Sequence, residues 1–287
     1  MKVLLFGGTG LLGSALRDSV PSGVTVIAPP RGELDITNEN AVAAAVSAAR
    51  PDWIAVCAAY TAVDRAESEP ELARVLNATA VAHVARAAAD VGARVLLPST
   101  DYVFQGDPGR PWREDDAPDP HGAYATSKRD GELALEASGA AHVIVRTSWV
   151  FGPGRRSFPR AMWERAIRRE AARVVADQRG TPTAAVDLAN WCWTLMASEA
   201  RGVLHGSNRG ETTWFEVARR AFAHAAFAEG VTPVASADFP TPARRPLYSV
   251  LDCSRLDALL AAAGAPPRRS WEDALDEYLA TLKPNDS

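Results

Sequence analysis

The chain has 287 residues, of which 47% are hydrophobic and 23% charged, and its 31 basic and 35 acidic residues leave a net charge of −4. This composition is typical of a globular protein of about two domains and excludes a strongly cationic nucleic-acid binder. No apolar run approaches the roughly 18 residues of a membrane-spanning helix, and the run from Val3 to Phe6 is too short for a secretion signal. The sequence therefore predicts a soluble, cytoplasmic protein that binds neither nucleic acid nor membrane.

The sequence predicts no metal site. Its three cysteines, Cys57, Cys192 and Cys253, are odd in number and widely separated, which disfavours both a disulfide framework and a zinc site. The five histidines show no spacing suited to metal binding or to a catalytic triad, and we interpret them as structural.

The first half of the chain alternates short apolar runs with longer helical patterns, which is typical of parallel β-α-β units. Strands are predicted at 3–6, 24–28, 53–58, 94–97 and 143–146, and helices at 11–20, 38–49, 71–91 and 124–138. These elements predict an α/β fold with a doubly wound, Rossmann-type parallel sheet, whose ligands bind beyond the carboxyl ends of the strands.

The second half is less regular. Helices are predicted at 157–172, 186–198 and 272–282, a short strand at 173–175, and a proline-rich loop at 235–247. We expect residues 1–150 to form a dinucleotide-binding domain to which 176–200 return. Residues 151–175 and 201–287 are expected to form a smaller substrate-binding region.

A glycine-rich turn lies between the first predicted strand and the first helix. Glycines there permit a tight turn, a close approach of backbone amides to a pyrophosphate, and close packing of helix on strand. The helix N-terminus adds N–H donors and a partial positive charge. The turn predicts nucleotide binding by Gly7, Thr9, Gly10, Leu11, Leu12 and Gly13.

The end of the second strand bears on the choice of dinucleotide, because a carboxylate there would hold the ribose hydroxyls of NAD. The chain has no acid at this point but has Arg31, which could pair with a 2′-phosphate or could be a solvated loop residue. The sequence thus favours NADPH and leaves NADH open. Asp35 and Ile36 either bracket the adenine, or Asp35 only starts the following helix.

Tyr124 and Lys128 are four residues apart and share one face of a predicted helix. Only three of the 31 basic residues are lysine, so a lysine at this position calls for a reason. Its ammonium can lower the pKa of a neighbouring phenol and can also reach ribose hydroxyls. A phenol tuned in this way exchanges protons readily. The pair therefore predicts acid–base catalysis beside a bound dinucleotide.

Thr100 follows the fourth predicted strand, 24 residues before Tyr124. Its hydroxyl can hydrogen-bond the carbonyl oxygen that the phenol protonates. The alternative is a local turn in which the hydroxyl binds backbone at the end of the strand.

Together these residues resemble the extended short-chain dehydrogenase/reductases, and within them the dTDP-4-dehydrorhamnose reductase family. The likeness runs over nearly the whole chain, and the segments that carry it are 34–37, 58–67, 99–104, 146–151, 177–183, 245–246 and 249–252. The resemblance implies hydride transfer from a nicotinamide to the C4 ketone of a dTDP-4-keto-6-deoxyhexose, in dTDP-L-rhamnose or related deoxysugar biosynthesis.

The resemblance also implies roles for individual residues. Tyr124 would protonate the ketone oxygen, Thr100 would hold it, and Lys128 would bind ribose and tune Tyr124. The further residues implied at the cofactor are Ala58, Ala59, Tyr60 and Asn77, although Asn77 could equally be an exposed helix position. Those implied at the sugar are Thr61, Asp101, Tyr102 and Trp149, and Gln178 and Thr181 would form part of the wall between the two.

The nucleotide diphosphate needs cationic anchors, for which arginine is well suited. The candidates are Arg155, Arg156, Arg160, Arg244 and Arg245, and Arg245 is the best placed because it lies within a family-like segment. Some relatives carry a glutamate in the first helix that serves a metal-bridged dimer, whereas this chain has Ala15. A homodimer is therefore left open.

Three alternatives stay open. The chain could reduce another nucleotide sugar in antibiotic biosynthesis. It could be a non-catalytic, NADP-binding regulatory subunit that resembles the β subunit of methionine adenosyltransferase, although such a subunit has no need of a proton donor. It could be a related epimerase or dehydratase, but Asp101 has no adjacent glutamate to complete the acid–base pair of a dehydratase.

Overall fold

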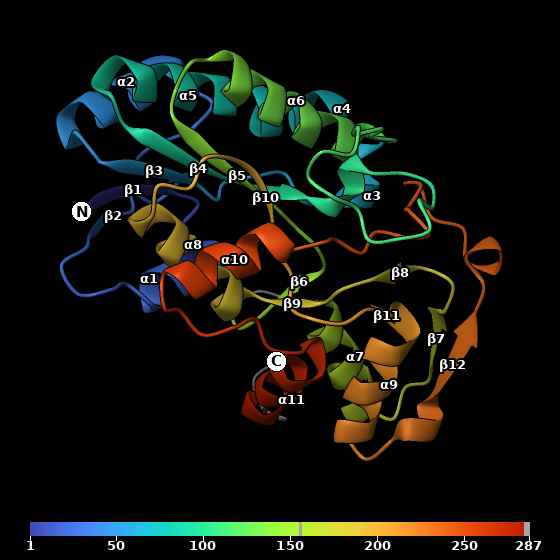
Figure 1. Cartoon of the computed structure of the whole chain (residues 1–287). Helices are drawn as coiled ribbons and strands as arrows, with labels where there is room; N and C mark the ends of the chain where they lie inside the picture. The colour runs from blue at the N-terminus through green and yellow to red at the C-terminus, as the bar shows by residue number, and fades with distance from the viewer. Residues whose placement is uncertain (155–156, 284–287) are drawn as a thin grey trace.

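A parallel sheet of six strands forms the centre of the computed structural model, which describes residues 1–154 and 157–283 (Figure 1). The strands are β1 (Lys2–Phe6), β2 (Thr25–Ile27), β3 (Trp53–Val56), β4 (Arg94–Thr100), β5 (His142–Thr147) and β10 (Gly202–His205). Their order is β10-β5-β4-β3-β1-β2, and every neighbouring pair is parallel. The predicted doubly wound α/β sheet is confirmed.

Helices cover both faces of this sheet (Figure 1). One layer contains α2 (Glu39–Ala49), α4 (Pro70–Arg74), α5 (Ala80–Val91) and α6 (Ala123–Ala137). The opposite layer contains α1 (Leu11–Asp18), α8 (Ala185–Ala197) and α10 (Ser254–Ala262). Each layer packs on its own apolar cluster, and alternate residues of the buried strands point into one cluster or the other.

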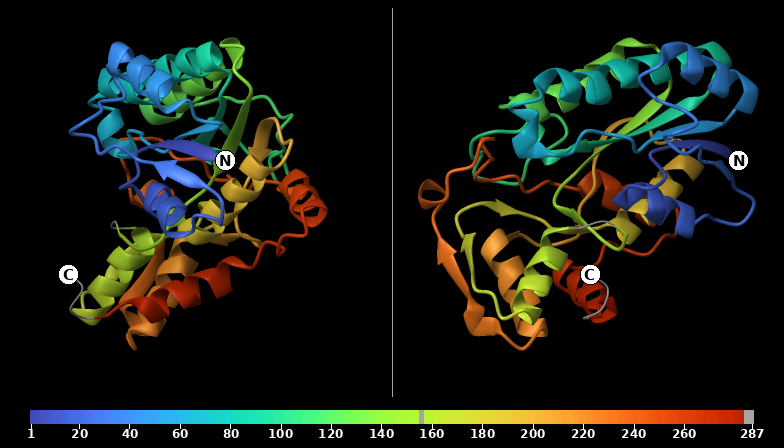
Figure 2. Two further views of the ribbon diagram at one scale, coloured as in Figure 1. Left: turned by 90° about the vertical axis from the view of Figure 1, so that its left-hand side faces the viewer. Right: turned by 180° about the vertical axis from the view of Figure 1, so that it is seen from behind.

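The remaining elements form a second body below the sheet in Figure 1 and in both views of Figure 2. It contains the helices α7 (Phe158–Ile167), α9 (Trp214–His224) and α11 (Trp271–Thr281). Three two-stranded ladders join them: β6 (Val150–Phe151) with β9 (Thr183–Ala184), β7 (Ala172–Val175) with β12 (Val231–Val234), and β8 (Arg179–Gly180) with β11 (Thr212–Thr213). A short α3 (Val63–Ala66) follows β3.

The chain returns to the sheet more often than the sequence suggests. Helix α8 packs against α1, as expected for 176–200. However, β10 and α10, which fall in the range predicted to bind substrate, belong to the main sheet and its helical layer. The domain boundaries themselves stay a prediction.

Two predicted helices differ from the structure. The helix expected over 71–91 consists of α4, a π-helical turn at Val75–Thr79, and α5. The helix expected over 157–172 ends at Ile167, where Arg169 adopts a left-handed conformation with φ +57° and the chain enters β7. Helices α9 and α10 were not predicted.

Over the two described ranges, no helix is both long enough and apolar enough to cross a membrane. No cluster of three or more His, Cys, Asp or Glu side chains placed to hold a metal ion occurs in that part of the chain either.

Candidate active site

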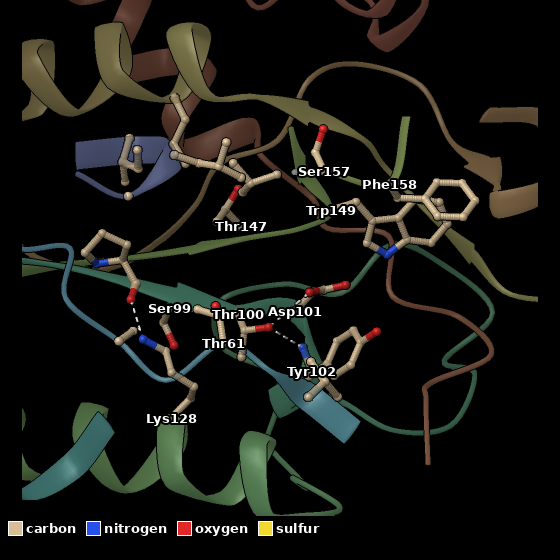
Figure 3. Close-up of a pocket in the computed structure, with 18 of the residues that line it drawn as sticks. Thr61, Ser99, Thr100, Asp101, Tyr102, Lys128, Thr147, Trp149, Ser157 and Phe158 are labelled. Carbon is tan, nitrogen blue, oxygen red and sulfur yellow. Dashed lines mark hydrogen bonds between the residues drawn. The ribbon is translucent and has the colours of Figure 1, made fainter. Parts of the chain in front are cut away.

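A cavity of about 530 Å³ opens at the carboxyl ends of β1, β3, β4 and β5 and extends toward α7 and α9 (Figure 3). This is the edge at which a doubly wound sheet binds its ligands. The predicted site residues that line the cavity are Gly10, Leu11, Leu12, Ala59, Thr61, Thr100, Asp101, Tyr102, Tyr124, Lys128 and Trp149. The fold therefore brings most of the predicted site together from segments spread over 140 residues.

The glycine-rich turn is shaped by two very close backbone approaches. Gly7 has φ +82°, and a Cβ on it would lie 2.3 Å from the backbone nitrogen of Ala58. A Cβ on Gly13 would lie 2.1 Å from the carbonyl oxygen of Gly7. Only glycine fits at these positions. The two glycines therefore allow α1 to start directly beneath β1 and β3.

Helix α1 begins at the cavity without a side-chain cap. Its N-cap residue is Gly10, and among the described residues no side chain accepts from the first-turn amides. Those N–H groups, at the positive end of the helix, are free to bind an anion in the cavity. A glycine turn with an uncapped helix start is a good fit to a dinucleotide pyrophosphate.

Tyr124 and Lys128 lie on the face of α6 that meets the end of β4. Lys128 is buried, and its Nζ donates to the carbonyl oxygen of Pro98 at 2.7 Å, drawn as a dashed line above Lys128 in Figure 3. Thr100 is 5% exposed, and its Oγ1 accepts from the Tyr102 amide at 3.2 Å. The local-turn role considered for Thr100 is thus present, and the hydroxyl faces the cavity as well.

The expected lowering of the Tyr124 pKa by Lys128 is not found. Burial raises the pKa of Tyr124 to about 12, and the Thr100 hydroxyl acts in the opposite direction without outweighing it. Burial also lowers the pKa of Lys128 to about 8. The Lys128 ammonium donates to the Pro98 carbonyl and is not among the groups that shift the pKa of the phenol. Tyr124 is therefore protonated at neutral pH.

Asp101 is a buried carboxyl group beside Thr100. It is 2% exposed, and its Oδ2 has no hydrogen-bond partner in the structure. Burial raises its pKa to about 7, against the opposing effect of hydrogen bonds from Ser249 and Thr100. An unpaired carboxyl oxygen at the cavity wall is suited to accept a hydrogen bond from a ligand hydroxyl.

Two stacked tryptophans form the opposite wall. The rings of Trp149 and Trp214 are 3.7 Å apart and inclined by 13°, and Phe158 packs edge-on against Trp214. Trp149 has φ +49°, a strained value for a bulky residue. Gly180 lies against the same residue, where a Cβ would come within 2.5 Å of the indole. Trp214, which also lines the cavity, was not predicted. The one feature of the local sequence that could have drawn attention to it is the helix start after Thr213, whose hydroxyl caps α9.

Asn77 is a backbone-bridging residue and not an exposed helix position. It is 2% exposed, its Oδ1 accepts from the Tyr60 amide at 2.8 Å, and its Nδ2 donates to the Tyr60 carbonyl at 3.0 Å. The same Nδ2 donates to Ser127 on α6 at 3.0 Å. Asn77 therefore holds the segment after β3 against α6, while the Tyr60 phenol donates to Glu69.

The residues predicted near the adenosine lie outside the cavity. Arg31 is exposed. Asp35 accepts hydrogen bonds from the amide and the hydroxyl of Thr37 in the turn before α2, whose N-cap is Asn38. Ile36 is 6% exposed and packs in the core beneath α2. Their binding roles stay predictions.

Arg245 is already engaged in an ion pair. Its Nη1 and Nη2 contact the two carboxylate oxygens of Asp64 at 3.0 and 2.7 Å. Arg160 pairs with Glu164, and Arg244 is exposed. The remaining two candidate anchors, Arg155 and Arg156, lie outside the described residues.

Ala58, Gln178 and Thr181 do not line the cavity. Ala58 packs under Gly7, where it leaves no room for a side chain on that glycine. Gln178 donates to Ser236 at 2.9 Å, and Thr181 donates to the Gly210 carbonyl at 2.8 Å. In the structure both side chains therefore bind protein groups.

A family model described as the RmlD substrate binding domain matches residues 1–283. The chain belongs to this family. A relative from Streptomyces griseus, named dTDP-4-dehydrorhamnose reductase, is 42% identical and covers 97% of this chain and 93% of its own. A relative from Streptomyces antibioticus, named as a probable dTDP-4,6-dihydroxy-2-methyloxan-3-one 4-ketoreductase, is 40% identical over 96% of this chain and 94% of its own.

A solved structure supports the same assignment. The dTDP-4-dehydrorhamnose reductase from Bacillus anthracis, described as a complex with NADP, superposes with a TM-score of 0.92 at 36% identity. The superposition covers 98% of this chain and 99% of the other. The resemblance stated from sequence motifs and the Rossmann-type fold are therefore confirmed.

Proposed function

We propose that the chain is an NADPH-dependent reductase that converts the C4 ketone of a dTDP-4-keto-6-deoxyhexose to a hydroxyl group, with dTDP-4-dehydrorhamnose as its first candidate substrate. The observation that carries the proposal is the meeting of Thr100, Tyr124 and Lys128 at one cavity that begins at the glycine-rich turn. The names of the relatives support the reaction and the substrate class, and the NADP in the Bacillus anthracis structure supports the cofactor.

NADPH supplies the hydride that is added to C4 of the sugar. The first-turn amides of α1 would bind its pyrophosphate, with Gly10, Leu11 and Leu12 lining that part of the cavity. Lys128, with its ammonium held at the cavity floor, would bind the ribose hydroxyls. The absence of a carboxylate after β2, together with the exposed Arg31, favours NADPH over NADH.

The proton that completes the reduction comes from Tyr124. A phenol with a pKa of about 12 is protonated at neutral pH, so the donor is in its correct form before the reaction. The Thr100 hydroxyl contacts the phenol and can hold the ketone oxygen beside it. As the C4–H bond forms, the oxygen gains the Tyr124 proton, which leaves a phenolate beside the Thr100 hydroxyl.

The sugar would lie between the Thr100 and Tyr124 hydroxyls and the wall formed by Trp149 and Trp214. Asp101, Tyr102 and Thr61 line one side of the cavity, and Trp149 lines the other. The unpaired Asp101 oxygen provides an acceptor for a sugar hydroxyl, and the flat indole provides an apolar surface for the ring. Arg245 is proposed to contact the diphosphate while it remains paired with Asp64.

The experiment is to replace Tyr124 by Phe and follow NADPH oxidation with dTDP-4-keto-6-deoxyglucose and a 3,5-epimerase in the same tube. The wild-type protein should oxidise NADPH only when sugar is present, and Tyr124→Phe should be slower by about 10²-fold or more. Tyr278→Phe, which removes a hydroxyl on α11, is the matched control and should keep wild-type rates.

Equal rates for Tyr124→Phe and wild type would overturn the assignment of the proton donor. If both proteins bind NADPH and neither reduces any ketosugar, the regulatory-subunit alternative takes its place. A reductase that prefers a sugar other than dTDP-4-dehydrorhamnose would match the Streptomyces antibioticus relative, and a panel of dTDP-4-ketosugars distinguishes the two.

A cytoplasmic location and a homodimer are retained as proposals. NADPH and nucleotide sugars are made in the cytoplasm, which supports the first. Cell fractionation tests the location, and sedimentation or light scattering of the purified protein tests the oligomeric state.

A further inference from the structure

Helix α6 carries a further buried polar side chain, one turn beyond Lys128, that the proposed reaction does not use. Tyr124, Lys128 and Glu132 are spaced four residues apart and share one face of the helix. Glu132 is 0% exposed and does not line the cavity. A carboxylate is buried in this way only where it has strong partners, and those partners come from the two strands that end at the site.

The Glu132 carboxylate is bound from three directions. Ser99 of β4 donates its hydroxyl proton to Oε1. Arg146 of β5 contacts both oxygens, with Nε to Oε1 at 3.0 Å and Nη2 to Oε2 at 2.7 Å. Arg129 donates to Oε2 at 2.8 Å from the helix itself. Glu132 therefore joins α6 to β4 and β5 in the interior of the protein.

These bonds fix the end of β4. Ser99 directly precedes Thr100, and Pro98 accepts from Lys128 at 2.7 Å. Two successive residues of the strand are thus held against α6, one through Lys128 and one through Glu132. The distance between the Thr100 hydroxyl and the Tyr124 phenol depends on this junction, because one group lies on β4 and the other on α6.

We propose that Glu132 is a positioning residue of the reduction, which holds Thr100 and Tyr124 at their working separation by joining β4 and β5 to α6. The inference rests on the function proposed above. Glu132 touches neither the cavity nor the reacting atoms, so its effect on the reaction passes through Ser99 and the helix. A shift of about 1 Å between catalytic groups is enough to slow a reaction by roughly 10²-fold.

Glu132 also contributes to the electrostatic surroundings of Lys128. The ammonium is faced by Glu132 from α6, by the Cys57 thiol from the end of β3, and by the Pro98 carbonyl from β4. Replacing Glu132 by a neutral residue removes the carboxylate charge from the groups around the ammonium. We therefore expect Lys128 to lose its proton at lower pH in such a variant.

The test compares Glu132→Gln, Ser99→Ala and Glu136→Gln as full-length proteins in the NADPH oxidation assay. Glu132→Gln should lower kcat by about tenfold or more while KM for the ketosugar and Kd for NADPH stay within about twofold of wild type. The basic limb of its kcat/KM profile should move to lower pH. Ser99→Ala should lower kcat without moving that limb, because the carboxylate remains. Glu136, one turn further on and partly exposed, contacts Arg129 at 3.7 Å, and its variant should behave as wild type.

A folded Glu132→Gln protein with the wild-type kcat and pH profile would overturn the inference. If Glu132→Gln does not fold, Ser99→Ala decides: a fall in kcat at constant KM sustains the proposal, and an unchanged kcat overturns it. A wild-type protein that reduces no ketosugar would contradict the proposed function itself, and the inference with it. Normal wild-type activity with unaffected variants contradicts the inference alone.

Discussion

Arg245 and Asp64, 181 residues apart in the chain, form a two-point ion pair that ties the proline-rich loop to α3 beside the cavity. Asp64 also accepts from the Ala243 amide at 3.2 Å, and hydrogen bonding to Arg245 lowers the pKa of its carboxyl group. The pair joins a segment near the C-terminal end of the chain to one that follows the third strand of the sheet. It therefore fixes the orientation of the arginine that we propose as an anchor for the diphosphate.

Replacing Asp64 by Asn should clearly weaken binding of the nucleotide sugar and should lower the free energy of unfolding only slightly. The pair is partly exposed, so its loss should cost less than about 1 kcal/mol of unfolding free energy. Freeing one long side chain should raise KM for the sugar about three- to tenfold and leave Kd for NADPH unchanged. Steady-state kinetics and urea unfolding measure the two effects. Glu71→Gln, which breaks an exposed pair on α4, is the control, and an identical KM for all three proteins would remove the proposed role.

Replacing Gly13 by Ala should disrupt the nucleotide-binding turn. The new Cβ would lie 2.1 Å from a backbone oxygen, so α1 must move away from β1 at a cost of about 1–3 kcal/mol. NADPH binding, measured by fluorescence titration, should be lost or greatly weakened. Gly32→Ala, at a position with open space, should leave both binding and melting temperature close to wild type. Wild-type NADPH affinity in Gly13→Ala would contradict this account of the turn.

Replacing Trp214 by Ala should remove the support of Trp149. We expect kcat/KM for the ketosugar to fall by about tenfold, since a stacked pair contributes roughly 0.5–1.5 kcal/mol and fixes one wall of the site. Kd for NADPH should not change. The exciton signal of two stacked indoles in circular dichroism should disappear, whereas Trp163→Phe on α7 should retain it. An unaltered kcat/KM together with loss of the exciton signal would show that the stack does not serve the site.

Asp101 should give stability a specific pH dependence. Its pKa is raised to about 7 in the folded protein, and the unfolded carboxyl titrates near 4. Between these values the folded state holds a proton that the unfolded state has released, so this group makes stability fall as pH rises from about 4 to 7. The slope is at most about 1.4 kcal/mol per pH unit.

Asp101→Asn should therefore gain stability relative to wild type across this range, with a constant difference above about pH 7. Urea unfolding at a series of pH values measures the difference. Asp115→Asn, at an exposed position, should show no such trend. A difference between Asp101→Asn and wild type that is independent of pH would contradict the raised pKa.

The parallel sheet was predictable because its strands are buried on both faces and appear as continuous apolar runs separated by turns. The turn at Gly7 and the pair Tyr124 and Lys128 were predictable for a related reason, since each depends on residues close together in the chain. Strand β10 was missed because it consists of four residues, Gly202–His205, that become a strand only by pairing with β5.

The parts of the site that were missed depend on distant contacts. Trp214 reaches Trp149 from α9, and Asp64 reaches Arg245 from α3. Neither residue has a local pattern that indicates a binding role. The predicted lowering of the Tyr124 pKa by Lys128 is not found, and helical spacing alone does not reveal that the ammonium is bound to Pro98. Spacing gives proximity along a helix, and the surrounding strands determine orientation.

Because α8, β10 and α10 return to the central sheet, the chain cannot be truncated freely between its two halves. One apolar cluster combines Leu12 and Leu16 from the first helix with Leu195, Leu204 and Leu256 from the second half. A fragment that stops at residue 150 would expose this surface and leave β5 as an open edge. Truncation to obtain an isolated nucleotide-binding module should therefore give an aggregating product, and co-expression of both fragments is the arrangement that the topology favours.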